Sequence, residues 1–415
     1  MNQYVIIGNG VAAAGCIEGI RSTDKESSIT VISEENYPVY CRPLISYYLE
    51  GKTTLEKMNY RPADFYEKNN CQVLYGKKAT SIDNETKTIT LDDGSTVCYT
   101  SLCLATGSSP FVPPVKGLDT VENYHTFLTL DDSLGLEKAI NKDSRVLIVG
   151  AGLIGLKCAE GILDRVKSIV VCDLADRILS SILDAECAGM MAKSLKEKGV
   201  HFMLNDTAVE FVKNTALMKS GANIEFDVLV MAVGVRANLG LAQQLGCETN
   251  RGILIDEQMQ TSIPGIYAAG DCSEGFDSSL GSRRVLAILP NAYMQGHCAG
   301  INMAGGQDVF NNAIPMNSIG FFDCHAMTAG SYFEADEDHQ IYEEKTDTTL
   351  KKLFIHNNQL TGYILIGNVD RAGIYTALIR EKTPLDTVDF DVLKKDPCFR
   401  AFTAENRSKK FGGVV

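Results

Sequence analysis

The sequence predicts an α/β protein that combines two similar strand–turn–helix units with a smaller α+β part at its C-terminal end. Three observations lead to this fold class. An apolar run followed by a glycine-rich turn and a helix of small residues occurs near residue 10 and again near residue 150. The segment after Gly306 instead contains short strand-like runs separated by turn residues. The length of 415 residues allows two or three domains of ordinary size.

The first unit has the sequence YVIIGNGVAAAGCIEGIRSTDKESSITVISEE. Its expected elements are, in order, a strand at Tyr4–Ile7, the turn pattern Gly8-x-Gly10-x-x-Ala13 with a helix, and a strand at Ile29–Ile32. In such a pattern the first glycine makes the tight turn and the second lets a pyrophosphate approach the backbone. The third small residue lets helix and strand pack closely. Glu34 and Glu35 follow the second strand, where a carboxylate can accept hydrogen bonds from ribose hydroxyls.

The second unit, SRVLIVGAGLIGLKCAEGILDRVKSIVVCDLADRIL, repeats this order. Its expected elements are a strand at Val146–Val149, the turn Gly150-x-Gly152-x-x-Gly155 with a helix, and a strand at Ile169–Val171. Asp173 lies 23 positions after Gly150, close to the expected spacing of about 20. One such turn is a weak signal, because glycine turns occur in many α/β proteins. Two copies, each followed by an acidic residue, predict two Rossmann-like dinucleotide-binding domains and therefore electron transfer between two dinucleotides.

Two further stretches indicate which dinucleotides are bound. They are LCLATGSSPFVPP at Leu102–Pro114 and TSIPGIYAAGDCSEG at Thr261–Gly275. With the two glycine turns, and in the same order along the chain, they resemble the motifs of the flavin-dependent pyridine nucleotide:disulfide oxidoreductase superfamily, which has the glutathione reductase fold. The resemblance covers roughly the first three quarters of the chain in detail. It implies that FAD and NAD are the cofactors.

The resemblance also implies a set of residues around the flavin. It implies that the first glycine turn binds the pyrophosphate of FAD and that Asp271 binds the ribityl chain. Glu35 would bind the adenosine ribose, and Glu34 is the alternative residue for that role. A helix that begins near Pro290 is expected to direct its positive end at the flavin. The whole expected set is Gly8, Gly10, Ala13, Glu34, Glu35, Arg42, Pro43, Ala79, Ala105, Thr106, Gly107, Asp271 and Pro290.

On the nicotinamide side, Asp173 favours NADH, because a carboxylate accepts from the 2′-hydroxyl but repels a 2′-phosphate. Arg177 is either a partner for that phosphate or a surface residue, so NADPH is disfavoured rather than excluded. Family members often have glutamate where this chain has Lys157; the lysine either changes how the carboxamide is held or extends into solvent. The implied set is Gly150, Gly152, Ile154, Gly155, Asp173 and Gly234.

The stretch YPVYCRPLISYYLEGK raises the question whether Cys41 is a redox thiol. The disulfide reductases of the superfamily carry C-x-x-x-x-C beside the flavin, and nothing in this chain matches that pattern. Another branch has a single cysteine in a stretch like S-F-x-x-C-G-x-x-x-Y-L-E-G, but aligning its YLEG with Tyr48–Gly51 puts Pro43 at the cysteine position. Tyr40–Ser46 is instead similar to the Y-x-[RK]-P-x-L-S region of NADH:rubredoxin reductases, NADH-nitrite reductases and ferredoxin reductases. Cys41 is therefore expected to be a bystander. Arg42 is expected to lie near the flavin, where its charge can neutralise the pyrophosphate or a reduced flavin, and the alternative is a surface salt bridge.

Without a relay thiol, electrons must pass from the flavin directly to an external acceptor. The main hypothesis is an NADH-dependent FAD reductase for a small metalloprotein, rubredoxin or ferredoxin. One alternative is an NADH oxidase that uses oxygen, and another is an NAD(H)-sensing or assembly subunit of a larger redox complex. No catalytic side chain and no metal site are expected, because the thirteen cysteines contain no C-x-x-C pair.

The expected domains are a flavin domain at 1–112 and 238–310, a nicotinamide domain at 113–237, and a C-terminal interface or acceptor domain at 311–415. The last is expected to contain strands at Ser318–Phe322, Leu350–Ile355 and Gln359–Ile366, a turn at Asn357–Asn358 and a helix at Ala372–Arg380. The basic residues after Lys394, which include Lys409 and Lys410, suggest either a docking patch for an acidic carrier or a solvated tail.

Composition limits the partners and the location. The net charge of −13 argues against nucleic acid as a partner, because phosphate binding needs a basic face. No apolar run approaches the length of about 18 residues that a membrane helix needs. The free thiols and the N-terminal sequence MNQYVIIGNG favour the reducing cytoplasm. The sequence leaves open whether the protein is a monomer or a homodimer.

Overall fold

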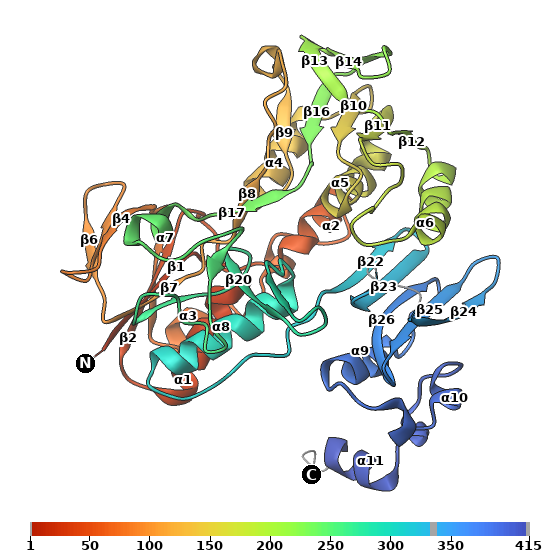
Figure 1. The fold of residues 1–415 in the computed structure, drawn as a ribbon. Helices are drawn as coiled ribbons and strands as arrows, with labels where there is room; N and C mark the ends of the chain where they lie inside the picture. Colours follow the sequence, from red (N-terminus) through yellow and green to blue (C-terminus); the bar gives the residue numbers. More distant parts are fainter. Residues whose placement is uncertain (1, 333–337, 412–415) are drawn as a thin grey trace. The chain divides into compact units, whose positions relative to one another are not determined.

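The structure is a computed structural model that describes residues 2–332 and 338–411 (Figure 1). Contacts group the chain into two compact units. The first contains the residues up to Asp176 together with Gly199–Phe276 and Arg283–Asn311, and the second contains Arg177–Lys198, Asp277–Ser282 and the chain from Asn312 onward. The first unit holds both glycine-turn motifs, and the second holds most of the expected C-terminal domain. The domain boundaries at 112/113, 237/238 and 310/311 stay predictions.

The first glycine turn belongs to a five-stranded parallel sheet with the order β19-β7-β1-β2-β3. β1 pairs with β2 from Gln3↔Ser28 to Ile7↔Ile32, which confirms the two expected strands. The strands of a parallel sheet are covered on both faces, which explains why they read as apolar runs. Their bounds are β1 (Gln3–Ile7), β2 (Ser28–Ser33), β3 (Cys71–Tyr75), β7 (Ser101–Leu104) and β19 (Ile266–Ala268).

The second glycine turn belongs to another five-stranded parallel sheet, with the order β12-β11-β10-β16-β9. In each sheet the strand before the glycine turn has the next two strands along the chain on one side and a later strand, β7 or β16, on the other, and only the fifth strands differ in chain order. This shared arrangement confirms the predicted pair of Rossmann-like folds. The strand bounds are β9 (Tyr124–Thr126), β10 (Arg145–Val149), β11 (Ser168–Asp173), β12 (Val200–Leu204) and β16 (Val228–Met231). The chain passes from one sheet to the other through β8 (Ser108–Pro110) and returns through β17 (Val235–Ala237), and these two strands pair antiparallel.

Three smaller sheets complete the strands outside the C-terminal domain. They contain β4 (Ala79–Asp83), β5 (Thr88–Leu91) and β6 (Thr96–Cys98); β13 (Ala208–Val212), β14 (Thr215–Met218) and β15 (Asn223–Glu225); and β18 (Ile253–Leu254), β20 (Ser273–Asp277) and β21 (Ser282–Arg284). The helices of the first unit are α1 (Val11–Thr23), α2 (Ile45–Leu49), α3 (Phe65–Lys68), α4 (Leu130–Ala139), α5 (Leu153–Ile162), α7 (Gly240–Leu245) and α8 (Leu289–Met303).

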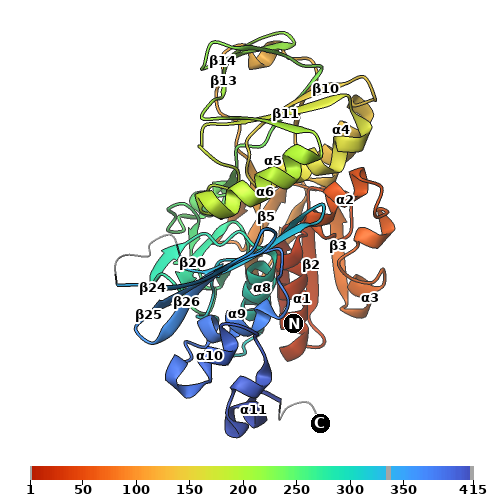
Figure 2. The same ribbon diagram turned by 90° about the vertical axis from the view of Figure 1, so that its right-hand side faces the viewer.

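Helices α1 and α8 run side by side and touch along a seam of glycines (Figures 1 and 2). A Cβ atom added to Gly296 would lie only 1.9 Å from the carbonyl oxygen of Ala12. A larger residue would therefore push the helices apart. Four backbone contacts of this kind make the seam: Gly15 with Tyr293, Gly19 with His297, Gly296 with Ala12, and Gly300 with Cys16. Gly19 and His297 each lie four residues after Gly15 and Tyr293, and Cys16 and Gly300 each lie four residues after Ala12 and Gly296. Both helices therefore advance in the same direction, so they are parallel and their N-termini lie at the same end.

The second unit contains an antiparallel sheet with the order β22-β23-β26-β25-β24, and α9 packs on it. Asn357 and Asn358 both have positive φ, which confirms the predicted hairpin turn. The bounds are β22 (Met316–Phe321), β23 (Cys324–Gly330), β24 (Gln340–Lys345), β25 (Leu350–His356), β26 (Gln359–Ile366), α6 (Ala185–Glu197), α9 (Ala372–Arg380), α10 (Phe390–Leu393) and α11 (Ala404–Phe411).

Two features of this unit were not expected from the sequence. Helix α6, which lies inside the predicted range of the nicotinamide domain, groups with the C-terminal sheet. The basic C-terminal segment follows α10 and includes α11, but the side chains of Lys409 and Lys410 lie outside the described residues, so the docking hypothesis for them is not tested. Within the described part of the chain, no helix is long and apolar enough to cross a membrane.

The glycine seam gives a prediction about stability. We expect Gly296→Ala to lower the free energy of unfolding by about 2 kcal/mol, because overpacking a filled contact forces the backbone to shift. Chemical denaturation of the purified protein measures this change. Gly189→Ala in α6 is the matched control, because an added Cβ there meets nothing within 4 Å of the described atoms. The control should be neutral or stabilising by up to about 1 kcal/mol; equal losses for both variants would contradict the seam.

Candidate dinucleotide-binding site

The first glycine of each turn occupies the same place in the two sheets. Gly8 has φ of +108° and Gly150 has φ of +117°, values that side chains rarely allow. A Cβ added to Gly8 would lie 2.1 Å from the carbonyl oxygen of Ala105, and one added to Gly150 would lie 2.3 Å from that of Ala232. Both positions therefore need glycine for the turn and for the close approach of the neighbouring strand.

The second glycine of each turn leaves room for a ligand. Gly10 is the N-cap of α1 and Gly152 is the N-cap of α5, and neither cap makes a side-chain hydrogen bond. No described atom lies within 4 Å of a Cβ added to either residue. The exposed N–H groups and the positive helix end form a cradle that fits a pyrophosphate. The residues present at both turns therefore fit a dinucleotide.

The third small position of each turn is tightly packed. Ala13 is fully buried, and a Cβ on Gly155 would lie 2.1 Å from the carbonyl oxygen of Gly150. Ile154 lies one residue earlier in α5. Only a small side chain lets helix and strand meet here, as the sequence pattern predicts.

Sequence reasoning identified Ala105-Thr106-Gly107 but missed the equivalent role of Ala232. Each alanine contributes the carbonyl that covers the first glycine, and Gly107 and Gly234 both have positive φ. Ala105 donates its N–H to Ile7 O, and Ala232 donates to Val149 O, each at 2.8 Å. The signal was present, because both stretches have the form Ala-x-Gly after a buried strand.

Asp271 lies where the N-termini of α1 and α8 meet. A Cβ on the preceding Gly270 would lie 3.1 Å from Ala12 Cβ and 3.6 Å from Ala292 Cβ, so the loop fits between the first turns of the two helices. The Ser108 hydroxyl donates to Asp271 Oδ2 at 3.1 Å. Burial raises the pKa of the Asp271 carboxyl, and the Ser108 hydrogen bond and the charge of Arg42 oppose that rise. Ser108 is a site residue that the sequence analysis missed.

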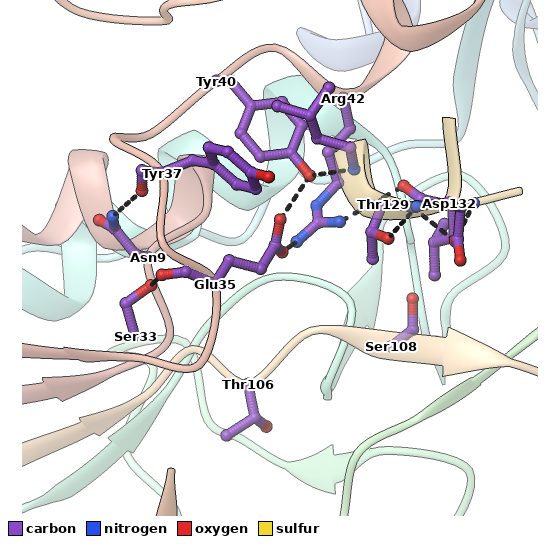
Figure 3. Close-up of polar contacts among 12 residues, drawn as sticks. Asn9, Ser33, Glu35, Tyr37, Tyr40, Arg42, Thr106, Ser108, Thr129 and Asp132 are labelled. Carbon is purple, nitrogen blue, oxygen red and sulfur yellow. Dashed lines mark hydrogen bonds and ion pairs between the residues drawn. The ribbon is translucent and has the colours of Figure 1, made fainter. Parts of the chain in front are cut away.

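Figure 3 shows Glu35 between Tyr40 and Arg42. The Arg42 guanidinium forms an ion pair with Glu35, and the Tyr40 hydroxyl donates to Glu35 Oε2 at 2.6 Å. Arg42 also donates to the carbonyl of Leu128 at 3.3 Å. The structure thus brings Glu35 and Arg42 together, although the sequence assigned them to different parts of the flavin. The rival carboxylate, Glu34, instead pairs with Lys78 at 3.0 Å near the surface.

The same stretch ties the first sheet to α4 of the second. The Tyr37 hydroxyl donates to Asp131 Oδ1 at 2.6 Å, and the Tyr48 hydroxyl donates to Glu137 Oε2 at 2.9 Å. The hydroxyl of Ser133 donates in return to the carbonyl of Ile45 at 3.2 Å. The sequence analysis assigned no role to these tyrosines. They align the segment around Arg42 with α4 from its first turn to its last.

Cys41 has the surroundings of a structural residue. Its N–H donates to Met58 O at 2.8 Å, and burial raises the pKa of its thiol. A raised pKa reduces the fraction of thiolate, which is the form that attacks disulfides and peroxides. This chemistry favours the prediction that Cys41 is not a relay.

Asp173 is held beside the second glycine turn. Its carboxylate accepts from the N–H of Ala151 at 2.6 Å and from the N–H of Ala175 at 2.8 Å. The Arg177 guanidinium donates to the carbonyls of Leu183 and Ser180, so it stabilises the loop that follows Arg177 in the chain. These contacts favour the interpretation of Arg177 as a loop residue over that of a partner for the 2′-phosphate. The preference for NADH stays a prediction.

Lys157 does not extend into solvent, so that alternative is wrong. Its side chain is 16% exposed, its Nζ lies 2.6 Å from Glu160 Oε2 and 4.9 Å from the centre of the Tyr47 ring. A carboxylate one helical turn away compensates the charge of Lys157.

Three other expected cofactor residues occupy ordinary structural positions. Pro43 lies in the 3₁₀ turn Arg42–Leu44, Ala79 begins β4 and is buried, and Pro290 lies in the first turn of α8 as predicted. Their contacts with a cofactor stay predictions, as do the ligand roles of the glycine and acidic residues above.

Comparison with known families agrees with this geometry. The model of the pyridine nucleotide-disulphide oxidoreductase family matches residues 2–296, and that of the rubredoxin NAD+ reductase C-terminal domain matches residues 315–383. The chain belongs to the pyridine nucleotide-disulphide oxidoreductase family. It is therefore an NAD(P)H-dependent flavin oxidoreductase, and FAD and NAD(P)H are its cofactors.

Members of this family resemble the chain over most of its length. It is 33% identical over 394 residues to the epsilon subunit of an NADH-dependent phenylglyoxylate dehydrogenase from Aromatoleum evansii, covering 92% of each chain. It is 30% identical to a nitrite reductase [NAD(P)H] from Bacillus subtilis, matching 92% of this chain but only 48% of that protein. The putidaredoxin reductase in its covalent complex with putidaredoxin has the same fold, with a TM-score of 0.85, 23% identity, and 95% and 96% of the two chains covered.

In this oxidoreductase, the described residues show how the protein would bind and orient its two cofactors. The FAD that these residues would hold would supply hydride acceptance and one-electron release. The two cradles would hold one pyrophosphate each, at the N-termini of α1 and α5. The tyrosine contacts to α4 fix how the two halves of the first unit face each other. The N-terminus of α8 would stabilise negative charge on a reduced cofactor.

The surroundings of Cys41 predict a mild effect of its removal. We expect Cys41→Ser to retain FAD and to keep the rate of NADH-driven dye reduction within about twofold of the wild type. Steady-state kinetics and the flavin absorbance measure these quantities. Cys98→Ser, at an exposed cysteine of β6, is the control. A large loss of turnover in Cys41→Ser alone, with FAD still bound, would instead show that Cys41 reacts.

The hydrogen bonds of Asp173 predict a change in nucleotide preference. We expect Asp173→Asn to raise the Kd of NAD⁺ about tenfold and to leave that of NADP⁺ unchanged or lower, because a charged acceptor for the 2′-hydroxyl is lost. Titration calorimetry of the oxidised enzyme measures both constants. Equal weakening of both nucleotides would show that Asp173 only supports the turn through Ala151 and Ala175.

Proposed function

We propose that this enzyme passes electrons from NADH through FAD to a small one-electron carrier such as rubredoxin or ferredoxin. The observation that carries the proposal is the match of residues 315–383 to the rubredoxin NAD+ reductase C-terminal domain. The surroundings of Cys41 support it, because its N–H donates to Met58 O at 2.8 Å and burial raises the pKa of its thiol. In this proposal the flavin delivers its electrons directly to an external acceptor.

A second candidate function is that of the NADH-oxidising subunit of a larger dehydrogenase. The specific observation in its favour is the epsilon subunit from Aromatoleum evansii, which the chain matches over 92% of both lengths. In that case the natural acceptor would be a redox centre of a partner subunit rather than a diffusing carrier. The flavin chemistry and the sites of the first unit would be the same in both cases.

The cysteines support a reducing compartment for either function. All thirteen are free, and most are buried in the cores of the two units. Disulfides are rare where the cytosolic thiol pool keeps cysteines reduced. We therefore propose that the enzyme works in the cytoplasm. We also propose that it is a monomer or a homodimer.

Anaerobic stopped-flow absorbance tests the proposal. The FAD-loaded enzyme is reduced with NADH and then mixed separately with rubredoxin, ferredoxin and oxygenated buffer while the flavin band is followed. We expect rapid reoxidation by one carrier and slow reoxidation by oxygen. Fast reoxidation by oxygen alone would overturn the proposal in favour of an NADH oxidase. Slow reoxidation by all three would overturn it in favour of the subunit, and affinity purification from the native cells should then retain partner subunits.

A further inference from the structure

Helix α2 (Ile45–Leu49) connects the two halves of the first unit, which we name the Gly8 half and the Gly150 half after the glycine turns of their sheets. It follows the 3₁₀ turn Arg42–Leu44 of the Gly8 half, yet it lies beside α4 and α5 of the Gly150 half (Figures 1 and 2). Each of its residues contacts that half. The partners are Ser133 for Ile45, Gly161 for Ser46, Lys157 for Tyr47, Glu137 for Tyr48 and Arg165 for Leu49.

Helices α2 and α5 approach each other closely at Gly161. A Cβ atom added to Gly161 would lie 2.7 Å from the carbonyl oxygen of Ser46 and 3.4 Å from Leu49 Cβ. The nearest of these atoms belongs to the backbone of α2, so it cannot turn aside as a flexible side chain could. Any larger residue at Gly161 would therefore push α5 away from α2.

Lys157 lies one helical turn before Gly161, on the same face of α5. Its Nζ lies 4.9 Å from the centre of the Tyr47 ring, close enough for a cation–π attraction. Glu160 compensates the charge, with its Oε2 2.6 Å from the same Nζ. Both charged side chains are largely buried, so water screens these attractions less than it would at the surface. A carboxylate in place of Lys157 would be repelled by the ring face and by Glu160.

Arg165 connects the other end of α2 to the Gly150 half. Its guanidinium donates to the carbonyl of Leu49 at 3.1 Å and to Glu137 Oε1 at 3.0 Å. Glu137 belongs to α4 and also accepts from the Tyr48 hydroxyl. Helix α2 is thus held by α4 and α5 together, and a tilt of α5 against α2 would break these contacts.

The two helices lead directly to the proposed cofactor sites. Gly152, at the pyrophosphate cradle, is the N-cap of α5, and Gly161 lies in the last turn of the same helix. On the other side, Arg42 precedes α2 by one 3₁₀ turn and pairs with Glu35. Helices transmit displacements because they are rigid over this length. A shift of α5 at Gly161 would therefore also move the cradle at Gly152.

We propose that Gly161 and Lys157 are positioning residues for hydride transfer: their contact with α2 sets how closely the nicotinamide nucleotide approaches the flavin. In this step NADH loses a hydride, which carries two electrons, and FAD gains it, so that NAD⁺ and reduced FAD result. The inference rests on the proposed placement of the cofactors at the two glycine turns. Reacting atoms must be held about 3–3.5 Å apart, and an error of about 1 Å can cost about 100-fold in rate.

The substitution Gly161→Ala in the FAD-loaded enzyme tests the spacing. We expect the limiting rate of FAD reduction at saturating NADH, measured by anaerobic stopped-flow absorbance, to fall about tenfold or more. The Kd of NAD⁺, measured by titration calorimetry of the oxidised enzyme, should stay within about twofold, because α5 carries its cradle with it. Hydrogen exchange of residues 45–52 should rise, because the added methyl group loosens the contact with α2.

Gly135→Ala is the matched control. Gly135 lies in α4 of the same half, but a Cβ added there would meet only the His125 ring, at the ordinary distance of 3.8 Å. All three quantities should stay at their wild-type values. An unchanged limiting rate in Gly161→Ala would overturn the inference, whatever the hydrogen exchange. A fall in rate that comes with an equal rise in Kd, or that Gly135→Ala shares, would overturn it as well.

If Gly161→Ala does not fold, substitutions of Lys157 decide. Lys157→Gln keeps a hydrogen-bond donor for Glu160 but removes the cation, so the limiting rate should fall about fivefold while the Kd of NAD⁺ stays constant. Lys157→Arg should recover most of the rate, because a guanidinium also binds the face of an aromatic ring. Equal limiting rates in Lys157→Gln and the wild type would overturn the inference.

The outcome is independent of the carrier experiment. If NADH reduces the FAD but no carrier reoxidises it, the carrier proposal fails, while the limiting rates of FAD reduction still decide the role of Gly161 and Lys157. If a carrier reacts rapidly and all variants are reduced at the wild-type rate, only the inference about these two residues fails.

Discussion

The close packing of α1 and α8 is the constraint on which the rest of the first unit depends. These helices come from opposite ends of the unit, yet their backbones touch because Gly15 and Gly296 present no side chains at the seam. The contact makes the helices parallel, so two positive helix ends lie together. Gly270 fits between their first turns, which brings Asp271 to this end of the seam. The proposed flavin site therefore follows from backbone contact rather than from a reactive side chain.

The charges at this site are balanced by neighbours rather than by solvent. Arg42 pairs with Glu35 and also offsets the buried Asp271 carboxylate, whose pKa is raised by burial. Lys157 has a carboxylate partner in Glu160 one turn along α5. Such ion pairs keep the charged side chains in fixed positions, because breaking a partly buried ion pair costs free energy. A site of this kind can hold anionic cofactors. Burial raises the pKa of the Cys41 thiol beside it, which is the state expected of a cysteine that does not react.

The ion pairs of Lys352 join two distant parts of the sequence within the second unit. Lys352 lies in the region that matches the rubredoxin NAD+ reductase C-terminal domain, and its partners Asp184 and Glu186 lie in the crossover that follows β11.

The sequence by itself determined the two parallel sheets, the glycine turns, the start of α8 at Leu289 and the hairpin at Asn357, because these depend on local sterics and on periodic burial. It also determined that Ala13 and Gly155 must be small. Only the tertiary structure decided the partners of polar side chains. Ser108 and Asp271 are 163 residues apart, and no spacing rule relates them. The same is true of Lys352 with Asp184, which places α6 in the second unit. Side-chain pairing depends on which surfaces folding brings together, and a single sequence carries no periodic signal of that.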